Sequence, residues 1–357
     1  MRIVIDILTP KQCMLFSKLS ERLKQAGHEV FLVSRKYEEA VNLIRLKGLK
    51  AKIIGRHGGK ELANKLKASA QRILELTSYF REVDPDVAVS FSSPEMARVA
   101  FGLGIPHICV NDSPHAEAVA RLTIPLATKL LSPKAIPKRL WTRFGISSDR
   151  IRQYNALDPW AWLKDFKPDE KIISKLGLDL SKHILTFRPE EEFAAYLLSK
   201  TQGRMGIVSV IRKILDEKDD VQIIVIPRYE SQIKYLQEVF NGEIRILESS
   251  IDGPSLLYYT TIFIGGGGTM TAEASLLGVP TFSCYPAEPF IILKYLMKKK
   301  LVKLERNPEK LAKKVLATLD RIEYERMKQD ERAKRLVKTF EDPVEVIAEE
   351  VEKTVTS

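Results

Sequence analysis

Short apolar runs alternate with amphipathic stretches along the first half of the chain. The run IVIDIL, residues 3–8, precedes CMLFSKLSERLKQAG, in which Leu15, Leu19 and Leu23 share one helical face. Gly27 ends this stretch, where a helix commonly needs a left-handed residue. Helices are also expected at residues 38–47 and 61–81, between the strand-like runs EVFLVS, KAKIIG, DPDVAVSF, HICVND and TKLLSP. Repeated strand–helix alternation is typical of a parallel, doubly wound sheet.

The same alternation restarts in the second half, with the apolar runs HILTFRP, VQIIVIP, EIRILE, TIFIGG and PTFSCY. The segment NALDPWAWLKDFKPD between the halves is rich in Pro, Asp and aromatic residues and reads as a crossing. The charged tail is expected to be helical with a break at Pro343, which cannot continue a helix. We therefore expect two Rossmann-like α/β domains with parallel sheets, facing each other across a cleft. Their predicted bounds are 1–160 and 161–340, and a helix at 341–357 is expected to pack back on the N-terminal domain.

Length and charge narrow the class of protein. A chain of 357 residues exceeds a usual single core, which agrees with two domains. A net charge of +11 with a pI near 9.3 favours anionic partners such as nucleotides, phosphorylated lipids or acidic membranes. The alternative is a thermophile-like surface, rich in Lys and Glu, with a small basic excess. No nucleic-acid-binding module is recognisable, so nucleic acid is not an expected partner.

Cysteine usage and the N-terminus bear on the cellular compartment. Cys13, Cys109 and Cys284 are odd in number and far apart, so they form no metal-type spacing and no disulfide framework. The first apolar run is too short for an export signal, and no run approaches the roughly 20 residues that span a bilayer. We expect a cytoplasmic protein, or at most one peripheral to the inner face of the cell membrane.

Four consecutive glycines follow the apolar run TIFI. They are Gly265, Gly266, Gly267 and Gly268. Thr269 comes next, and a helix is expected over residues 270–277 with a glycine cap. A glycine turn lets backbone N–H groups approach phosphate oxygens, and a helix N-terminus adds roughly half a positive charge. No Lys follows as in a P-loop, and a dinucleotide fingerprint normally opens the first strand–helix unit. The turn therefore predicts a diphosphate site of another kind.

Glu273 is the only charged residue between Gly265 and Ala287, and it is expected in the first turn of the helix. In one interpretation its carboxylate accepts hydrogen bonds from ribose hydroxyls beside the diphosphate. In the other it only stabilises the helix dipole and contacts no ligand.

The segment GGGGTMTAEASLLGVP resembles the C-terminal nucleotide-sugar motif of GT-B proteins. These include MurG-type lipid glycosyltransferases and non-hydrolysing UDP-N-acetylglucosamine 2-epimerases. Nearly the whole chain resembles a largely archaeal GT-B-like family classed as a domain of unknown function. The segments that carry this resemblance include MRIVIDILTP, DPDVAVSFSSPEMARVAFGLGIPHICVNDSPHA, LTFRPEEEFAAY and FIGGGGTMTAEASLLGVPTF.

The resemblance implies roles for residues of the C-terminal half. The glycine turn with Thr269 holds the diphosphate, and Glu273 holds the ribose. Arg188, in LTFRPEEE, contacts the diphosphate through its planar guanidinium. The alternative for Arg188 is an ion pair with one of residues Glu190 to Glu192. Tyr196 either packs on a base or fills the core.

Polar residues follow several strands of the N-terminal half. In NDSPHAEA, Asp112 and His115 are the candidates for a general base, a role that suits His or an Asp with a raised pKa. The alternative is that Asp112 caps the next helix and His115 lies on the surface. In FSSPEMA, Ser93 is expected to cap the helix that begins at Pro94. The basic loop IGRHGGK, residues 54–60, either contacts an acceptor or sugar or merely turns the chain.

The sequence departs from both related enzyme classes. The loop LTPKQC lacks the glycines that lipid-type transferases show after their first strand. The 2-epimerases carry acidic residues where this chain has FSSPEM and NDSPHAEA, which leaves Glu95, Asp112 and Glu117 as imperfect substitutes. Neither reaction therefore transfers directly to this chain.

Two basic amphipathic segments are candidates for membrane contact. They are KAIPKRLWTRFG, with Trp141 and Phe144, and IILKYLMKKKLVKL. The alternative for both is an ordinary solvated helix face.

Together with the diphosphate site that the glycine turn predicts, the resemblance implies a glycosyltransferase that transfers sugar from a UDP-sugar to a lipid-linked or glycan acceptor. The nucleotide-sugar is a substrate, and no other cofactor is expected. No metal is expected either, because no Cys/His cluster suggests one and the helix end with Arg188 would neutralise the leaving diphosphate. The alternatives are an isomerase similar to UDP-N-acetylhexosamine 2-epimerases, and a non-catalytic nucleotide-sugar-binding protein.

Overall fold

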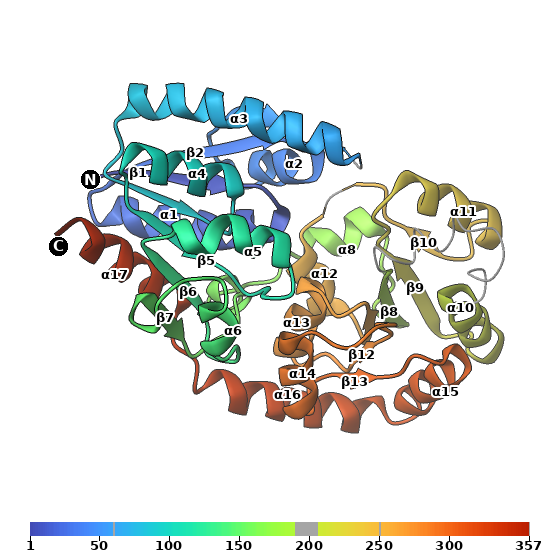
Figure 1. Ribbon diagram of the computed structural model, residues 1–357. Coiled ribbons are helices and arrows are strands. Elements are labelled where there is room, and N and C mark those ends of the chain that lie inside the picture. Colours follow the sequence, from blue (N-terminus) through green and yellow to red (C-terminus); the bar gives the residue numbers. More distant parts are fainter. Residues whose placement is uncertain (60, 190–205, 250, 357) are drawn as a thin grey trace. The chain divides into compact units, whose positions relative to one another are not determined.

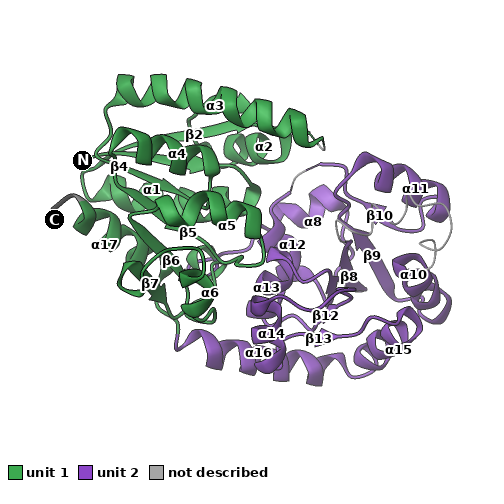
Figure 2. Ribbon diagram, viewed as in Figure 1, with its two compact units in different colours: residues 1–162, 340–357 green, residues 163–339 purple. Residues whose placement is uncertain are grey.

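A computed structural model describes residues 1–59, 61–189, 206–249 and 251–356. The chain divides into two compact units (Figure 2). Unit 1 comprises residues 1–162 and 340–357, and unit 2 comprises residues 163–339. Each contains one parallel sheet covered by helices, as the strand–helix alternation predicts (Figure 1).

Unit 1 is built on a seven-stranded sheet in the order β3-β2-β1-β4-β5-β6-β7. Its strands are β1 (Arg2–Ile7), β2 (Glu29–Lys36), β3 (Ala51–Arg56), β4 (Val87–Ser90), β5 (His107–Val110), β6 (Lys129–Pro133) and β7 (Ile151–Tyr154). Its helices are α1 (Pro10–Gln25), α2 (Glu38–Leu46), α3 (Leu62–Val83), α4 (Pro94–Leu103), α5 (Glu117–Thr123), α6 (Arg139–Thr142) and α17 (Pro343–Thr356), and α7 (Trp160–Leu163) lies at the unit boundary.

In unit 1, alternate side chains of the strands pack against the helices that cover the sheet. Val4 of β1 and Val33 of β2 join a buried cluster with Leu76 and Phe80 of α3, and α4 completes the same layer. The predicted helix α1 is confirmed, with Leu15, Leu19 and Leu23 buried. It starts where Thr9 caps it and ends before Gly27, whose φ is 83°.

Unit 2 is built on a six-stranded sheet in the order β10-β9-β8-β11-β12-β13. Its strands are β8 (His183–Arg188), β9 (Val221–Val225), β10 (Arg245–Ile246), β11 (Ile262–Gly265), β12 (Thr281–Ser283) and β13 (Lys303–Leu304). Its helices are α8 (Lys171–Leu176), α10 (Gly206–Glu217), α11 (Glu230–Phe240), α12 (Gly253–Tyr259), α13 (Thr269–Leu276), α14 (Ile291–Lys298), α15 (Pro308–Leu319) and α16 (Ile322–Val337). One face of the sheet packs on α10, α11 and α15, and the other packs on α8 and α12.

Both sheets reverse their strand order at the same relative place. In unit 1 the chain runs outward from β1 to β3 and then returns to β4 on the other side of β1. In unit 2 the same step leads from β8 out to β10 and back to β11. Ligands of open α/β sheets bind at such switch points, beyond the carboxyl ends of the strands. By this rule, a ligand of unit 1 would bind beyond the ends of β1 and β4, and a ligand of unit 2 beyond the ends of β8 and β11.

The C-terminal helix α17 belongs to unit 1. It begins at Pro343, the residue predicted to break the helical tail. Arg22 of α1 holds α17 in place, because its guanidinium lies 2.8 Å from Glu345 and 3.4 Å from Glu352.

Two expectations about strands were incomplete. The N-terminal sheet was expected to end at the run TKLLSP, but β7 adds a further strand beside β6. The run EIRILE contributes only the two residues of β10, and the segment assigned to a basic surface contains β13. These edge strands are short, which leaves little periodicity to recognise.

The largest side chains of the first candidate membrane segment are packed inward, which favours the alternative of an ordinary helix face, and membrane contact stays a prediction. Trp141 is fully buried, with its indole N–H donated to Ser132 at 2.9 Å, and Phe144 is buried as well. In α14, Leu293 and Leu296 are buried, and the lysines carry the exposed face. No helix in the described ranges has the length and apolar character needed to cross a bilayer.

Candidate functional site

The glycine turn lies at the switch point of unit 2. Gly265 ends β11 and stands opposite Arg188, the last residue of β8, in the parallel register. The helix α13 begins at Thr269 with Gly268 at its N-cap. The structure thus brings together the turn, the helix N-terminus and the arginine that the sequence nominated.

Close packing explains why Gly265 and Gly267 carry no side chain, but it does not explain the glycine at position 268. A Cβ on Gly265 would lie 2.6 Å from the ring of Phe263. Gly267 has a φ of +87°, and a Cβ there would lie 2.7 Å from Leu293. In contrast, Gly268 has an ordinary φ of −79°, and its nearest neighbour within 4 Å would be the guanidinium of Arg228 at 3.9 Å. Gly268 therefore leaves open space beside a positive charge.

The turn uses one of its own amides internally. The N–H of Gly267 donates to Oγ1 of Thr271 at 3.0 Å. Contrary to the expectation for the glycine turn, this amide is therefore not available to a ligand. Within the described ranges, no hydrogen bond joins the N–H of Gly268 or Thr269 to another protein group. The anion-binding capacity is thus concentrated at the start of α13.

Two arginines reach the same edge of the sheet. The Nη1 of Arg188 donates to the carbonyl oxygens of Ile226 at 2.9 Å and Pro227 at 2.6 Å, which fixes the guanidinium beyond the end of β9. Arg228 follows at once and is exposed. Its backbone N–H donates to the buried Gln232 at 2.7 Å. Residues 190–192 and 196, named as alternatives above, lie outside the described residues.

Glu273 does not lie in the first turn of α13, and that prediction was wrong. The helix starts at Thr269, so Glu273 is its fifth residue and the first turn holds no acidic residue. Its exposed fraction is only 5%. Because the dipole effect fades within the first turn, a purely dipole-stabilising role loses its basis.

A second polar cluster lies at the carboxyl edge of unit 1. The Nζ of Lys11, in the first turn of α1, lies 2.5 Å from Oδ2 of Asp112 and 2.5 Å from Oδ2 of Asp158. Tyr154, the last residue of β7, donates its hydroxyl to Oδ1 of Asp158 at 2.5 Å. Lys11 and Asp112 remain partly accessible, whereas the Asp158 side chain is 1% exposed.

The pKa values of the two carboxyl groups in this cluster shift in opposite directions. Burial favours the neutral form of Asp112, but the Lys11 ammonium and hydrogen bonds from Lys11 and Ser113 outweigh it and lower the pKa. For Asp158, burial and the nearby charge of Asp112 prevail over Lys11 and raise the pKa. Burial would lower the pKa of Lys11, yet the two carboxylates raise it. An aspartate that acts as general base was expected to have a raised pKa. In this cluster the pKa of Asp158 is raised, whereas that of Asp112 is lowered.

The alternatives for the loop after β5 are resolved only in part. Asp112 does not cap α5, because the N-cap is Ala116 and no side chain bonds there. Its Oδ1 accepts the hydroxyl of Ser113 at 2.8 Å. His115 is exposed at the surface. The Ser93 cap of α4 is confirmed, since its Oγ accepts the N–H of Met96 at 3.2 Å.

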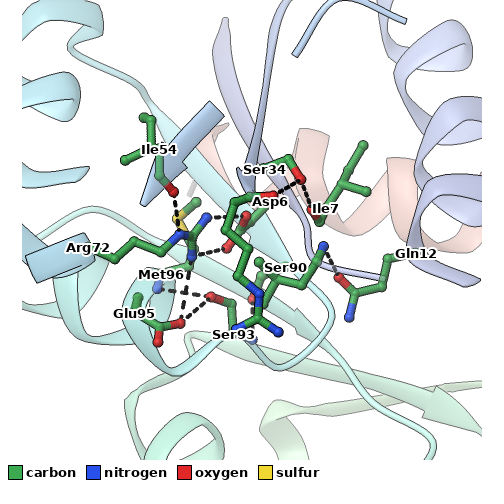
Figure 3. Close-up of polar contacts among 12 residues, drawn as sticks. Asp6, Ile7, Gln12, Ser34, Ile54, Arg72, Ser90, Ser93, Glu95 and Met96 are labelled. Atoms are coloured by element: carbon green, nitrogen blue, oxygen red, sulfur yellow. Dashed lines mark hydrogen bonds and ion pairs between the residues drawn. The ribbon is translucent and has the colours of Figure 1, made fainter. Parts of the chain in front are cut away.

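Two of the three candidate acids are engaged elsewhere. Arg72 binds both oxygens of buried Asp6 at 2.7 and 2.9 Å, and its Nη1 lies 3.6 Å from Glu95 (Figure 3). Glu117 is exposed and pairs with Arg121 one helical turn on, at 2.6 Å. Asp112 is thus the one of these three acids that remains at the strand ends without a structural Arg partner.

Comparison with known proteins places the chain in a family. The profile described as protein of unknown function (DUF354) matches residues 1–356. The chain belongs to this family. The uncharacterized protein MJ0665 of Methanocaldococcus jannaschii is 34% identical over 83% of the DUF354 chain and 85% of its own length.

Solved structures show that the DUF354 chain has a GT-B fold, as expected. One is UDP-GlcNAc 2-epimerase from Neisseria meningitidis bound to UDP-GlcNAc, with a TM-score of 0.71, 14% identity and 100% of each chain covered. Another is the spinosyn forosaminyltransferase SpnP, with a TM-score of 0.66, 15% identity and 100% of each chain covered. At these identities the likeness concerns the fold alone.

Sequence reasoning missed three residues of the DUF354 site regions. Arg228 carried a usable signal, because it lies in the loop just beyond the apolar run VQIIVIP, as Arg188 lies at the end of the run HILTF. Lys11 lies in the loop LTPKQC, which the sequence analysis described only by its lack of glycine. Asp158 lies in the crossing segment and carried no signal in the sequence pattern.

Proposed function

We propose that this protein binds a nucleoside diphosphate sugar in unit 2 and transfers the sugar from a UDP-sugar to a lipid-linked or glycan acceptor. The observation that supports this most is the pairing of Gly265 with Arg188 at the switch point. A glycine turn, a helix N-terminus and a guanidinium meet there. That combination suits two linked phosphates.

The same groups suit a diphosphate as leaving group. During transfer, the bond between the anomeric carbon and the β-phosphate oxygen breaks, and negative charge grows on that oxygen. Arg188, Arg228 and the amides of Gly268 and Thr269 stabilise this charge without reorganising. Glu273 is the candidate to accept hydrogen bonds from the ribose.

The acceptor would contribute a hydroxyl oxygen to the new bond and release a proton. Asp112 is the favoured acceptor of this proton, because Lys11 keeps it ionised and its side chain is 20% exposed. Its lowered pKa means that the proton moves late, when the new C–O bond is nearly formed. His115 remains the second candidate for this role.

Epimerisation at C2 of a UDP-N-acetylhexosamine is the second candidate, favoured by the fold likeness to the Neisseria enzyme. The engagement of Glu95 by Arg72 weighs against it, because a proton exchange at C2 needs accessible acids and bases. Incubation with UDP-GlcNAc in heavy water separates the two candidates. Deuterium at C2 supports epimerisation, whereas UDP release that requires an acceptor supports transfer.

Binding is tested by calorimetry with UDP and with UDP-, GDP-, CMP- and dTDP-sugars. We expect UDP-sugars to bind the wild type and Arg228→Gln to weaken binding about tenfold, as the loss of one charge-assisted hydrogen bond does. Arg321→Gln is the matched control, since that arginine contacts the Ala317 carbonyl and Glu325 of its own helical region, away from the glycine turn. If no nucleotide binds the wild type, both enzymatic candidates and the binding-protein alternative fail.

A further inference from the structure

Arg35 of β2 has an unusual environment for an arginine. It is the second-last residue of the strand, so its side chain starts at the carboxyl edge of the unit 1 sheet. Its Nε is buried and has no hydrogen-bond partner. In the described part of the chain, no ion pair or hydrogen bond reaches the rest of its guanidinium. Buried arginine nitrogens are normally paired, because an unpaired one costs its full desolvation.

The nearest carboxylates do not supply that partner. Asp6 is bound through both oxygens to Arg72, and Glu95 is engaged by Arg72 and by the Ser93 hydroxyl at 3.4 Å. Burial lowers the pKa of Arg35, and the like charge of Arg72 adds to that effect against the pull of Glu95 and Asp6. The protein therefore holds this guanidinium at the edge without a hydrogen-bonding anion of its own.

His57 adds a second donor beside it. The loop after β3 places His57 against the ring of Tyr37, with 5.3 Å between ring centroids. The N–H of Gly59 donates to Nδ1 of His57 at 3.1 Å, so neutral His57 carries its proton on Nε2. The backbone N–H of His57 donates to the carbonyl oxygen of Lys36, the residue after Arg35, at 3.1 Å, which places the His57 loop beside the end of β2. Burial and the charges of Arg35 and Lys65 lower the pKa of His57.

We propose that Arg35 and His57 bind an oxyanion, a phosphate or a carboxylate, in unit 1. The guanidinium offers two parallel N–H groups to such a group, and Nε2–H of His57 offers a third. Identifying the oxyanion as part of the acceptor rests on the proposed function, whereas the site itself does not. It deepens that function by requiring an acceptor with a negative charge.

Calorimetric titration of the full chain with inorganic phosphate, and separately with malonate, tests the site. Arg35→Met should weaken the preferred anion about tenfold, and His57→Phe, which keeps the aromatic contact with Tyr37, should weaken it several-fold. Lys36→Met is the matched control from the next position of the strand and should leave affinity unchanged. Comparing the two anions shows whether the site favours phosphate or carboxylate.

Stability supplies an independent readout. Because Arg35 is unpaired and close to Arg72, Arg35→Met should melt at or above the wild-type temperature in buffer without phosphate. UDP affinity should stay within about twofold, since that site lies in unit 2, so loss of UDP binding and loss of anion binding are separate outcomes. The proposal is overturned if Arg35→Met and His57→Phe both bind phosphate and malonate as the wild type does. A lower melting temperature for Arg35→Met with unchanged anion affinity also overturns it, since the role of Arg35 would then be structural.

Discussion

Arg188 and Gly265 end neighbouring parallel strands and stand opposite each other in the register of β8 and β11. Arg188 was nominated by the family resemblance, and Gly265 by the run of four glycines. Their meeting follows from topology, because β11 returns to the far side of β8 after the chain has built β9 and β10. The sheet thereby sets a long, forked cation next to a turn whose last glycine leaves open space.

Gly268 and Gly267 should respond differently to alanine. Gly268→Ala adds a methyl group where the nearest neighbour is 3.9 Å away, so the free energy of unfolding should change little. The methyl group would occupy the space beside Arg228, and we expect UDP affinity to fall about tenfold or more. Gly267→Ala should destabilise the protein by about 1–3 kcal/mol, because its φ is +87° and its Cβ would clash with Leu293.

Urea unfolding and calorimetry of both variants check this contrast. Gly102→Ala serves as a control, because its Cβ would meet only the flexible end of Arg98. Unchanged UDP affinity in Gly268→Ala would show that the open space is not a ligand site.

The buried pair of Asp6 and Arg72 should dominate the stability of unit 1. Asp6→Asn leaves the Arg72 charge, which is 1% exposed, without its bidentate partner. Breaking such a pair typically costs about 3–5 kcal/mol. Asp84→Asn breaks an equally short pair with Arg2, but the Asp84 side chain is 81% exposed, so no measurable loss is expected. Denaturant unfolding of the two variants should differ clearly, and equal losses would contradict this account.

Much of the fold was predictable because local patterns and topology agree. The stripe of Leu15, Leu19 and Leu23 predicted α1, and its burial against the sheet confirms the pattern. Ser93 before Pro94 predicted the start of α4 for a purely local reason, since the cap bonds a backbone N–H three residues away. Such signals depend on neighbours in sequence and need no tertiary information.

The site residues that escaped prediction depend on distant partners. Asp158 lies in a segment without periodicity, and its importance arises only where Lys11 from the start of α1 reaches it. Glu273 was misplaced because α13 begins one residue earlier than expected, which moves the carboxylate out of the first turn. Asp112 lies beyond the end of β5, as the sequence indicated, but the direction of its pKa shift depends on Lys11, which no local pattern reveals.

His107 should give the protein a proton-linked loss of stability in mild acid. It is fully buried, its Nε2 pairs with Ser90 at 2.9 Å, and burial lowers its pKa to about 4 from the usual 6.5. A lowered pKa stabilises the fold above pH 6.5, and this contribution is lost as the pH falls towards about 4. His107→Gln should therefore flatten the profile of unfolding free energy by up to about 1.4 kcal/mol per pH unit in that window.

Unfolding in urea from pH 7 to pH 4 measures this slope. His183→Gln is the control, because that side chain is 34% exposed at the surface. A profile for His107→Gln that matches the wild type would show that another group carries the acid sensitivity.

The contribution of Lys11 to the free energy of unfolding should be large at neutral pH and smaller in acid. In Lys11→Met, Asp112 and Asp158 lose the ammonium that lies 2.5 Å from each, and two carboxyl groups are left together in a buried setting. Their pKa values should then both rise, and a raised carboxyl pKa gives stability that is present at low pH and lost as the pH rises. We expect Lys11→Met to lose about 3 kcal/mol or more at pH 7, and to recover part of it near pH 5, where the wild type gains none.

Lys11→Met combined with Asp158→Asn should restore neutral stability in part, because only Asp112 then remains charged and it can reach solvent. Urea unfolding of these variants from pH 5 to pH 8 decides the matter, and a single Lys11→Met variant as stable as the wild type at pH 7 would mean that the cluster contributes no net stability.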